Sequence, residues 1–363
     1  MSIFKTHGIQ IAGICSAVPD RVYSVEEHQK RFPNDTVDKV CSSTGIRSIH
    51  LGDEYGQTAG DLGYVAADSL LNSLSVDRSK IGVLLFVSYA TDYIKPGTSS
   101  VLHMRLGLPN DCMATDIGQA CAGFVYGHQL MESLMATTDS PYGLLVLGDT
   151  GNRLVSREDH TSMMLGDAGS AVLYSRNSEY EDCTALYADG SSYQTIIVPA
   201  GGFRDPKAPN EKIKCSDDIT RTPYELYMDG LGVLTFSTNT VVDSLREYMQ
   251  QNELSQDDFD AFVFHQANMF IIQRLIKKLN LNPDKVPVSL DRYGNTSCSS
   301  IPLTICDSFG NSETQAPLRI LAAGFGIGLA WGITDITVSS DCIFPIIETS
   351  NCYKEGIINL EKL

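Results

Sequence analysis

Gln119-Ala120-Cys121-Ala122-Gly123-Phe124 is the stretch around which the rest of the sequence is organised. It follows Asp116, where a short strand is expected to end, and it leads into residues 124–135, whose apolar positions recur at helical spacing. Cys121 is therefore expected in the first turn of a helix, where unpaired amides and the helix dipole favour a thiolate. Taken alone, a buried structural cysteine is the commoner explanation.

Away from this stretch, short apolar runs alternate with longer helical patterns, which predicts an α/β protein with buried sheets. Strands are predicted at residues 9–18, 81–88, 142–148, 259–264 and 318–323, and helices at 62–70, 124–135, 224–248, 271–279 and 301–309. Each half of the chain closes with a glycine-punctuated pair of short strands, at residues 165–173 and 324–338. The repetition predicts two similar half-domains, residues 1–176 and 177–363.

One segment does not fit this alternation. Residues 199–222 are rich in Pro, Gly, Lys and Asp. They predict an irregular insertion beside the active site.

Composition excludes several classes of function. The 44 acidic and 27 basic residues leave a net charge of -17, which repels nucleic acid and anionic lipid. The apolar run at residues 9–18 is too short to span a bilayer. The ten cysteines show no CxxC or zinc-site spacing, as expected of reduced thiols in the cytoplasm, so no metal is expected.

Two further segments carry polar side chains suited to catalysis. His265-Gln266-Ala267-Asn268 follows a predicted strand, and the carboxyl ends of strands are where α/β proteins place ligands. Tyr293-Gly294-Asn295-Thr296-Ser297 reads as a glycine turn. Each has an ordinary structural explanation by itself. Together with Cys121 they form a nucleophile, an imidazole and a carboxamide, the set needed to accept an acyl group from a thioester.

At this point the sequence resembles the β-ketoacyl-acyl carrier protein synthase III family of the thiolase superfamily. The matching segments are Ser43-Thr44-Gly45-Ile46-Arg47 and residues 119–126, 166–173, 265–268, 293–302 and 324–332. The resemblance implies an α/β thiolase-like fold with five αβαβα layers, a homodimer and a catalytic triad of Cys121, His265 and Asn295. It implies no bound cofactor.

The resemblance also implies a reaction in two steps. Cys121 takes an acyl group from a coenzyme A or acyl carrier protein thioester, and the backbone amides of Cys121 and Ile327 form the oxyanion hole. A malonyl thioester then loses carbon dioxide while His265 and Asn295 donate hydrogen bonds to its thioester oxygen. The resulting enolate attacks the acyl-cysteine in a Claisen condensation, as in fatty acid or polyketide biosynthesis.

Several positions depart from the family pattern. Residues 40–43 lack the aromatic and basic residues that hold the coenzyme A adenine, and Phe270 replaces an arginine that docks carrier proteins, although Lys277 and Lys278 follow. Lys95 stands where the loop closing the partner's acyl pocket is usually apolar. Lys95, Phe270 and Phe325 are the expected substrate-binding residues. These departures predict a specialised member of the family.

Two alternatives remain open at this stage. The acyl-cysteine could pass its group to an alcohol or amine, which would form an ester or amide. The chain could also be a non-catalytic partner that only completes a dimer, in which case Cys121 would never be acylated.

Overall fold

A computed structural model describes residues 2–52, 56–312, 316–359 and 361 of the chain. Its strands are β1 (Ile3–Pro19), β2 (Val22–Ser24), β3 (Ser48–His50), β4 (Ile81–Val87), β5 (Met113–Ile117), β6 (Tyr142–Asp149), β7 (Ala168–Ala188), β8 (Ile196–Ile197), β9 (Ile213–Lys214), β10 (Thr220–Arg221), β11 (Tyr227–Met228), β12 (Ala261–Phe264), β13 (Pro317–Gly326), β14 (Ala330–Ser339) and β15 (Ile347–Thr349). Its α-helices are α1 (Val25–Gln29), α2 (Asn34–Thr44), α3 (Ala59–Ser73), α4 (Thr98–Arg105), α5 (Gly123–Met135), α6 (Gly230–Thr235), α7 (Val241–Gln251), α8 (Met269–Leu279), α9 (Leu290–Tyr293) and α10 (Ser300–Phe309).

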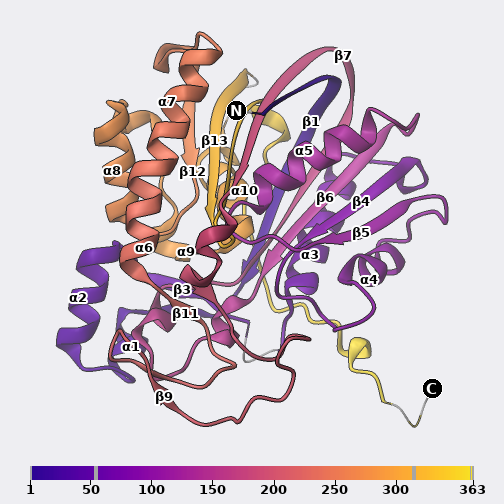
Figure 1. The fold of residues 1–363 in the computed structure, drawn as a ribbon. Coiled ribbons are helices and arrows are strands. Elements are labelled where there is room, and N and C mark those ends of the chain that lie inside the picture. The colour runs from indigo at the N-terminus through magenta and orange to yellow at the C-terminus, as the bar shows by residue number, and fades with distance from the viewer. Residues whose placement is uncertain (1, 53–55, 313–315, 360, 362–363) are drawn as a thin grey trace.

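In the described part of the chain nine strands form one continuous hydrogen-bonded network, and β7 belongs to both of the sheets into which this network divides (Figure 1). Its first part, residues 168–175, pairs with β6, and β4 lies between β6 and β5 in parallel. Its last part, residues 183–188, pairs with β14, and β13 connects β14 to β12. β1 runs antiparallel to β7 along nearly its whole length. The two sheets are therefore joined through one pair of long strands.

Three clusters of buried apolar residues separate five layers. The central cluster packs α5 and α10 between the two sheets. A second cluster packs α7 and α8 on the sheet that contains β12 and β13, and a third packs α3 and α4 on the sheet that contains β4 and β6. In Figure 1, α7 and α8 lie beside β12 and β13, while α5 and α10 lie between the two groups of strands. The predicted αβαβα fold is confirmed.

The predicted helix at residues 224–248 begins later than expected. Residues 227–228 form β11, which pairs with β8. The carboxylate of Asp229 then accepts hydrogen bonds from the backbone of Leu231 and Gly232, both 3.1 Å, and caps α6. A π-helical turn, Phe236–Thr240, joins α6 to α7. The helical prediction is wrong for residues 224–229, because a cap and a short strand replace the first turns.

The predicted pair of short strands at residues 165–173 is also wrong, because β7 continues for 21 residues. Residues 168–174 are buried and residues 182–185 are mostly buried, but the stretch at residues 175–181 is polar and largely exposed. A polar stretch of this kind reads as a turn in the sequence, whereas in the fold it is the part of β7 between the two sheets. The expected half-domain boundary at residues 176 and 177 falls inside this stretch.

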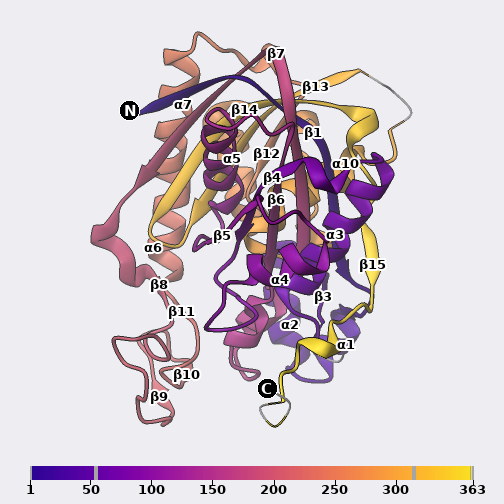
Figure 2. The ribbon, with the colours of Figure 1, turned by 90° about the vertical axis from the view of Figure 1, so that its right-hand side faces the viewer.

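Residues 199–222 form the predicted irregular segment, which contains only the two-residue strands β9 and β10. Figure 2 shows β8 to β11 extending from the lower end of the molecule. The guanidinium of Arg221 anchors this segment through a buried ion pair of 2.7 Å with Asp159. None of the helices in the described part of the chain has the length and apolarity to cross a membrane.

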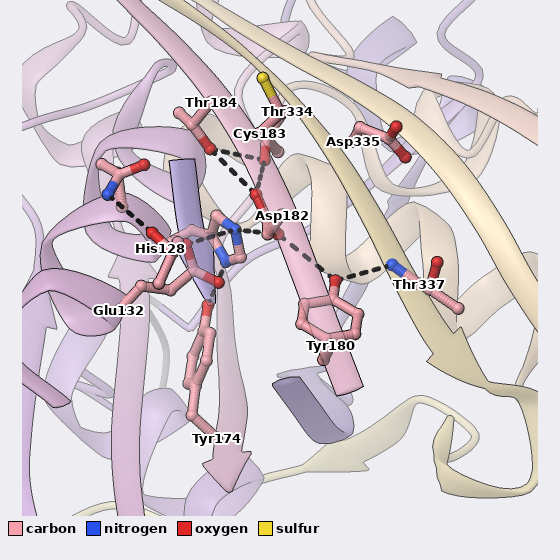
Figure 3. A network of polar contacts seen from close by, with 12 residues as sticks. His128, Glu132, Tyr174, Tyr180, Asp182, Cys183, Thr184, Thr334, Asp335 and Thr337 are labelled. Carbon is pink, nitrogen blue, oxygen red and sulfur yellow. Dashed lines mark hydrogen bonds and ion pairs between the residues drawn. The ribbon is translucent and has the colours of Figure 1, made fainter. Parts of the chain in front are cut away.

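A buried polar network connects α5 to β7 in the central layer (Figure 3). His128 Nε2 lies 2.9 Å from Asp182 Oδ2 and 3.6 Å from Glu132 Oε2, and its Nδ1 lies 2.9 Å from the hydroxyl of Tyr174. The side chains of His128 and Glu132 have no exposed surface. Tyr180 joins the network through a 3.3 Å hydrogen bond to Asp182.

Candidate active site

Cys121 lies in the turn between β5 and α5, two residues before the first helical residue. The backbone of Gly326 faces it, because a Cβ atom at position 326 would lie 3.0 Å from the Cys121 sulfur and 2.7 Å from its Cβ. Only glycine leaves this space free. The end of β13 and the beginning of α5 can therefore approach each other, with the sulfur of Cys121 between them.

The environment of Cys121 does not lower its pKa as expected. The residue retains some exposed surface, but its sulfur is enclosed, and this burial together with the charge of Asp149 raises the pKa of the thiol to about 12. Hydrogen bonds from the Ser297 hydroxyl and from the backbone of Cys121 and Ile327 lower the pKa only in part. The predicted net effect of the helix terminus is thus wrong, because desolvation of the thiolate outweighs it.

His265 directly follows β12, and its backbone N–H donates to the carbonyl oxygen of Ala323, 2.9 Å away. The imidazole Nδ1 lies 2.8 Å from the hydroxyl of Ser300, and the ring meets Phe325 edge-on with 5.6 Å between centroids. Burial lowers the pKa of His265 to about 3, and a hydrogen bond to the backbone of Ser297 offsets little of this. The ring is therefore neutral at physiological pH.

Asn295 is held by the loop that precedes β7. Its backbone N–H donates to the carbonyl of Met164 (2.8 Å), and its carbonyl accepts from Gly166 (3.1 Å). Its side-chain oxygen accepts from the backbone N–H of Ser297 at 2.9 Å. With Oδ1 used in this way, the amide NH₂ group is the part of the side chain left to donate to a ligand.

Two apolar cavities meet at the sulfur. The first, about 110 Å³, is lined by Cys121, His265, Asn295 and Phe325. Its other walls are mainly apolar, with Thr161, Ser237 and Asn268 as the polar exceptions; the larger apolar residues are Met164, Leu165, Ile196, Leu226, Met228, Val233, Leu234, Phe236 and Ile271. The second, about 120 Å³, shares Cys121 and Asn295 and adds Ile327, Ser297 and Asp149. The flanks of the irregular segment thus form part of the walls.

The remaining expected substrate-binding residues lie outside these cavities. Phe270 lines a surface groove of about 370 Å³ that adjoins the first cavity through Gly230, Leu234 and Asn268. The guanidinium of Arg274 lies 4.8 Å from the Phe270 ring centroid. Lys95 lines a separate groove with Tyr93 and Tyr353. Within one chain, Lys95 does not reach the cavities at Cys121.

Three residues near the site were not singled out from the sequence: Asp149, Ser297 and Ser300. Asp149 ends β6, whose apolar run in the sequence stops at Gly-Asp, and a polar residue at the carboxyl end of a parallel strand is a recognisable signal. Ser297 and Ser300 belong to the segment that follows Asn295. Their positions depend on a local conformation that the sequence does not specify.

Within the described residues, His128, Glu132 and Asp182 form the one group of metal-binding side chains, with donor atoms within 4.8 Å of one another. His128 Nε2 is already within hydrogen-bond distance of Asp182. A proton on this nitrogen supplies the positive charge that the two carboxyl groups require. The group lies among α5 and β7 side chains and takes no part in lining the cavities at Cys121.

Comparison with known proteins agrees with this architecture. Family models for 3-oxoacyl-[acyl-carrier-protein] synthase III and for its C-terminal part match residues 115–190 and 249–338. A β-ketoacyl-[acyl-carrier-protein] synthase III of Rhodopirellula baltica is 32% identical over 346 residues, 90% of this chain and 97% of that protein. A Xylella fastidiosa protein of the same name is 31% identical over 329 residues, 89% of this chain and 96% of that protein.

The structural comparison gives the same answer. The crystal structure of a 3-oxoacyl-(acyl-carrier protein) synthase from Burkholderia xenovorans superimposes with a TM-score of 0.90 at 33% identity, covering 96% of this chain and 99% of that one. The layered fold, with a cysteine in the turn before α5, is that of a thiolase-fold enzyme. The chain belongs to the 3-oxoacyl-[acyl-carrier-protein] synthase III family, and it is an acyltransferase of the ketosynthase type.

Proposed function

We propose that this enzyme forms an acyl-cysteine on Cys121 and condenses it with a malonyl-type thioester by decarboxylative Claisen chemistry. The observation that supports this most is the convergence of Cys121, His265 and Asn295 on one apolar cavity. These residues come from the β5–α5 turn, the end of β12 and the turn before α10. The donor of the acyl group would be a coenzyme A or acyl carrier protein thioester.

In the first step the sulfur of Cys121 attacks the thioester carbon, and the carbonyl oxygen takes up negative charge. The backbone N–H groups of Cys121 and Ile327 are the proposed donors to this oxygen, since both lie close enough to the sulfur to lower the pKa of the thiol. Gly326 leaves room above the sulfur for the acyl group. The donor thiol leaves, and the acyl-cysteine remains.

In the second step the malonyl thioester loses carbon dioxide and forms an enolate. A neutral His265 donates through Nε2 if the Ser300 hydroxyl donates to Nδ1, and the amide NH₂ of Asn295 supplies the second hydrogen bond. Both donors are neutral, so they stabilise developing negative charge without a proton transfer. The enolate carbon then attacks the acyl-cysteine.

The acyl group is proposed to be apolar. Among the residues that line the first cavity, only Cys121 and His265 are titratable, and most of the others are aliphatic or aromatic. Phe325 would contact the acyl chain, and Phe270 the thioester arm in the adjoining groove. A role for Lys95 in acyl binding is proposed only for the homodimer, in which its loop would face the partner's pocket.

The proposal is tested by incubating the enzyme with a panel of acyl thioesters and weighing the intact protein. An adduct is expected on Cys121 in the native enzyme and not in Cys121→Ala. Addition of a malonyl thioester should then release carbon dioxide and a 3-oxoacyl product. An ester or amide product, formed also by Asn295→Ala, would support acyl transfer instead, and a native protein that is never acylated would support the non-catalytic alternative.

We further propose that the enzyme is a homodimer of the cytoplasm, built from two related half-domains. All ten cysteines are free, which suits a reducing compartment. Among the strands that the structure describes, β5 pairs only with β4, which leaves its other edge for pairing with a second copy. Light scattering of the purified protein should give twice the 39.6 kDa chain mass; the chain mass itself would contradict the dimer.

A further inference from the structure

A buried carboxyl group shares the second cavity with the nucleophile. Asp149, at the end of β6, is 8% exposed and lines this cavity with Cys121 and Ser297. No lysine, arginine or histidine is among the residues lining it. A buried carboxylate without a cation is costly, so its position beside the reacting sulfur calls for an explanation.

Ser297 lies between the two groups. Its hydroxyl is 4.0 Å from the sulfur of Cys121, and its side chain is close enough to the carboxyl group of Asp149 to lower the pKa of that group. The backbone of Ser297 has φ of 52°, a left-handed conformation that a serine rarely adopts. The carboxamide of Asn295, which accepts from the Ser297 N–H, holds this conformation.

The charges around Asp149 favour proton uptake by the carboxyl group. The titratable groups that face it are Cys121, Cys298 and Tyr89, and none of them is cationic. Burial raises the pKa of Asp149, and hydrogen bonds from Ser297 and Gly151 reverse this only in part. His265, the other basic group at the site, is a poor proton acceptor because burial lowers its pKa to about 3.

We propose that Asp149 is the proton acceptor for Cys121, reached through the hydroxyl of Ser297, in the acylation step. This inference rests on the proposed function, and it adds two residues to the machinery of that step. Ser297 touches the reacting sulfur and relays the proton. Asp149 acts through Ser297 and holds the proton.

The step balances in protons and electrons. The S–H bond of Cys121 breaks as its sulfur bonds to the thioester carbon, and its proton moves to the Ser297 oxygen while the Ser297 proton moves to the Asp149 carboxylate. When the tetrahedral intermediate collapses, the donor sulfur leaves with the electron pair of its bond to carbon. The proton on Asp149 returns along the same route to that sulfur, which restores the carboxylate and releases a neutral thiol.

The test compares two reactions of Cys121 in the native enzyme and in Asp149→Asn: alkylation by iodoacetamide and acylation by an acyl thioester, both across pH 6 to 10. Removal of the Asp149 charge is expected to shift the alkylation profile to lower pH, because that charge raises the pKa of the thiol. Acylation at neutral pH is expected to fall by about 100-fold, since the proton acceptor is lost. If Asp149 had only a structural role, Asp149→Asn would not make Cys121 more reactive toward iodoacetamide and at the same time slower in acylation.

Two more variants complete the test. Ser297→Ala should slow acylation as well, but it should shift alkylation to higher pH, because the hydroxyl lowers the thiol pKa. Asp335→Asn is the matched control, since this carboxyl group is also largely buried but pairs with Arg319 in the other sheet, and it should leave both profiles unchanged. Acylation of Asp149→Asn at the native rate would overturn the proton-acceptor role. A native enzyme that no thioester acylates would remove the proposed function itself.

Discussion

The backbone of Gly326 lies so close to Cys121 that a residue with a side chain at this position would contact the nucleophile. Gly326→Ala places a methyl group 3.0 Å from the sulfur of Cys121 and 2.7 Å from its Cβ, so the turn before α5 must shift. A displacement of the reacting atom by about 1 Å is expected to reduce acylation roughly 100-fold. Intact-protein mass spectrometry over time measures this rate.

Gly202→Ala is the control for this change. A Cβ atom at position 202 has no neighbour within 4 Å, so the same substitution there should change neither acylation nor the melting temperature. If Gly326→Ala is acylated as fast as the native enzyme, the space above the sulfur is not used by the acyl group.

In the proposed mechanism the hydroxyl of Ser300 determines which ring nitrogen of His265 carries the hydrogen. The hydroxyl lies 2.8 Å from Nδ1. In that mechanism it donates to this nitrogen, which places the ring proton on Nε2, where it can reach a thioester oxygen. Ser300→Ala is expected to slow decarboxylation of a malonyl thioester by about 10-fold or more, while the first acylation of Cys121 stays near the native rate.

The neighbouring Ser299→Ala is a matched control, because this hydroxyl is also fully buried and, within the described part of the chain, makes no hydrogen bond to His265. The pH profile gives a second check. With a pKa of about 3, His265 stays neutral above pH 5, so no ionisation near pH 6.5 should appear in the decarboxylation rate. Equal losses in both steps for Ser300→Ala would contradict a role in tautomer control.

At the scale of single elements, α5 and β7 are linked by the network in Figure 3, and this link should depend on pH. Burial alone would lower the pKa of His128, but Glu132 and Asp182 raise it from 6.5 to about 9. Burial raises the pKa of Glu132 from 4.5 to about 7. In both cases the folded state holds a proton that the unfolded state has released, so stability is lost as pH rises.

Thermal unfolding should therefore show a decline in two windows, between about pH 4.5 and 7 for Glu132 and between about pH 6.5 and 9 for His128. The His128 share is on the order of 3 kcal/mol, from 1.36 kcal/mol per pKa unit. Glu132→Gln should remove the lower window and narrow the upper one, because the charge of Glu132 is the first of those that raise the pKa of His128. EDTA should leave the melting temperature unchanged, because a proton fills the space between His128 and Asp182; a fall of several degrees would indicate a metal ion there.

At the scale of the whole molecule, the sequence predicts the layers better than their connections. The fold class and most central strands follow from apolar runs such as residues 81–88 and 142–148, because a strand buried on both faces carries few polar residues. The continuity of β7 does not follow, since its polar middle reads as a turn. The ends of strands also indicate where Cys121 and His265 lie.

The remaining features of the site depend on pairing between distant segments. Asp149 lies near Ser297 only because β6 ends beside the turn that follows Asn295. No local sequence pattern predicts this proximity. The expectation for Lys95 concerns the partner subunit's pocket, so the groove that Lys95 lines within one chain does not test it. The catalytic roles of Cys121, His265 and Asn295 stay predictions until the acyl-enzyme is observed.

The shared strands make a prediction about how the molecule unfolds. β1 and β7 hydrogen-bond to each other through both sheets, and the central cluster takes residues from both halves. Neither half can lose its sheet without exposing the apolar face of the other, so we expect one cooperative transition in urea. Trp331, the only tryptophan, lies in β14 and reports on the C-terminal half by fluorescence.

Cys15 reports on the N-terminal half, because it is buried in the cluster under α3 and becomes open to a thiol reagent only when that cluster opens. The urea midpoints of Trp331 fluorescence and Cys15 labelling should coincide. Labelling of Cys15 at a clearly different urea concentration would mean that the half-domains unfold separately. In that case the long pair β1–β7 would act as a hinge between two units that unfold independently. The residues that each unit contributes to the Cys121 cavity would then keep their positions without support from the other unit.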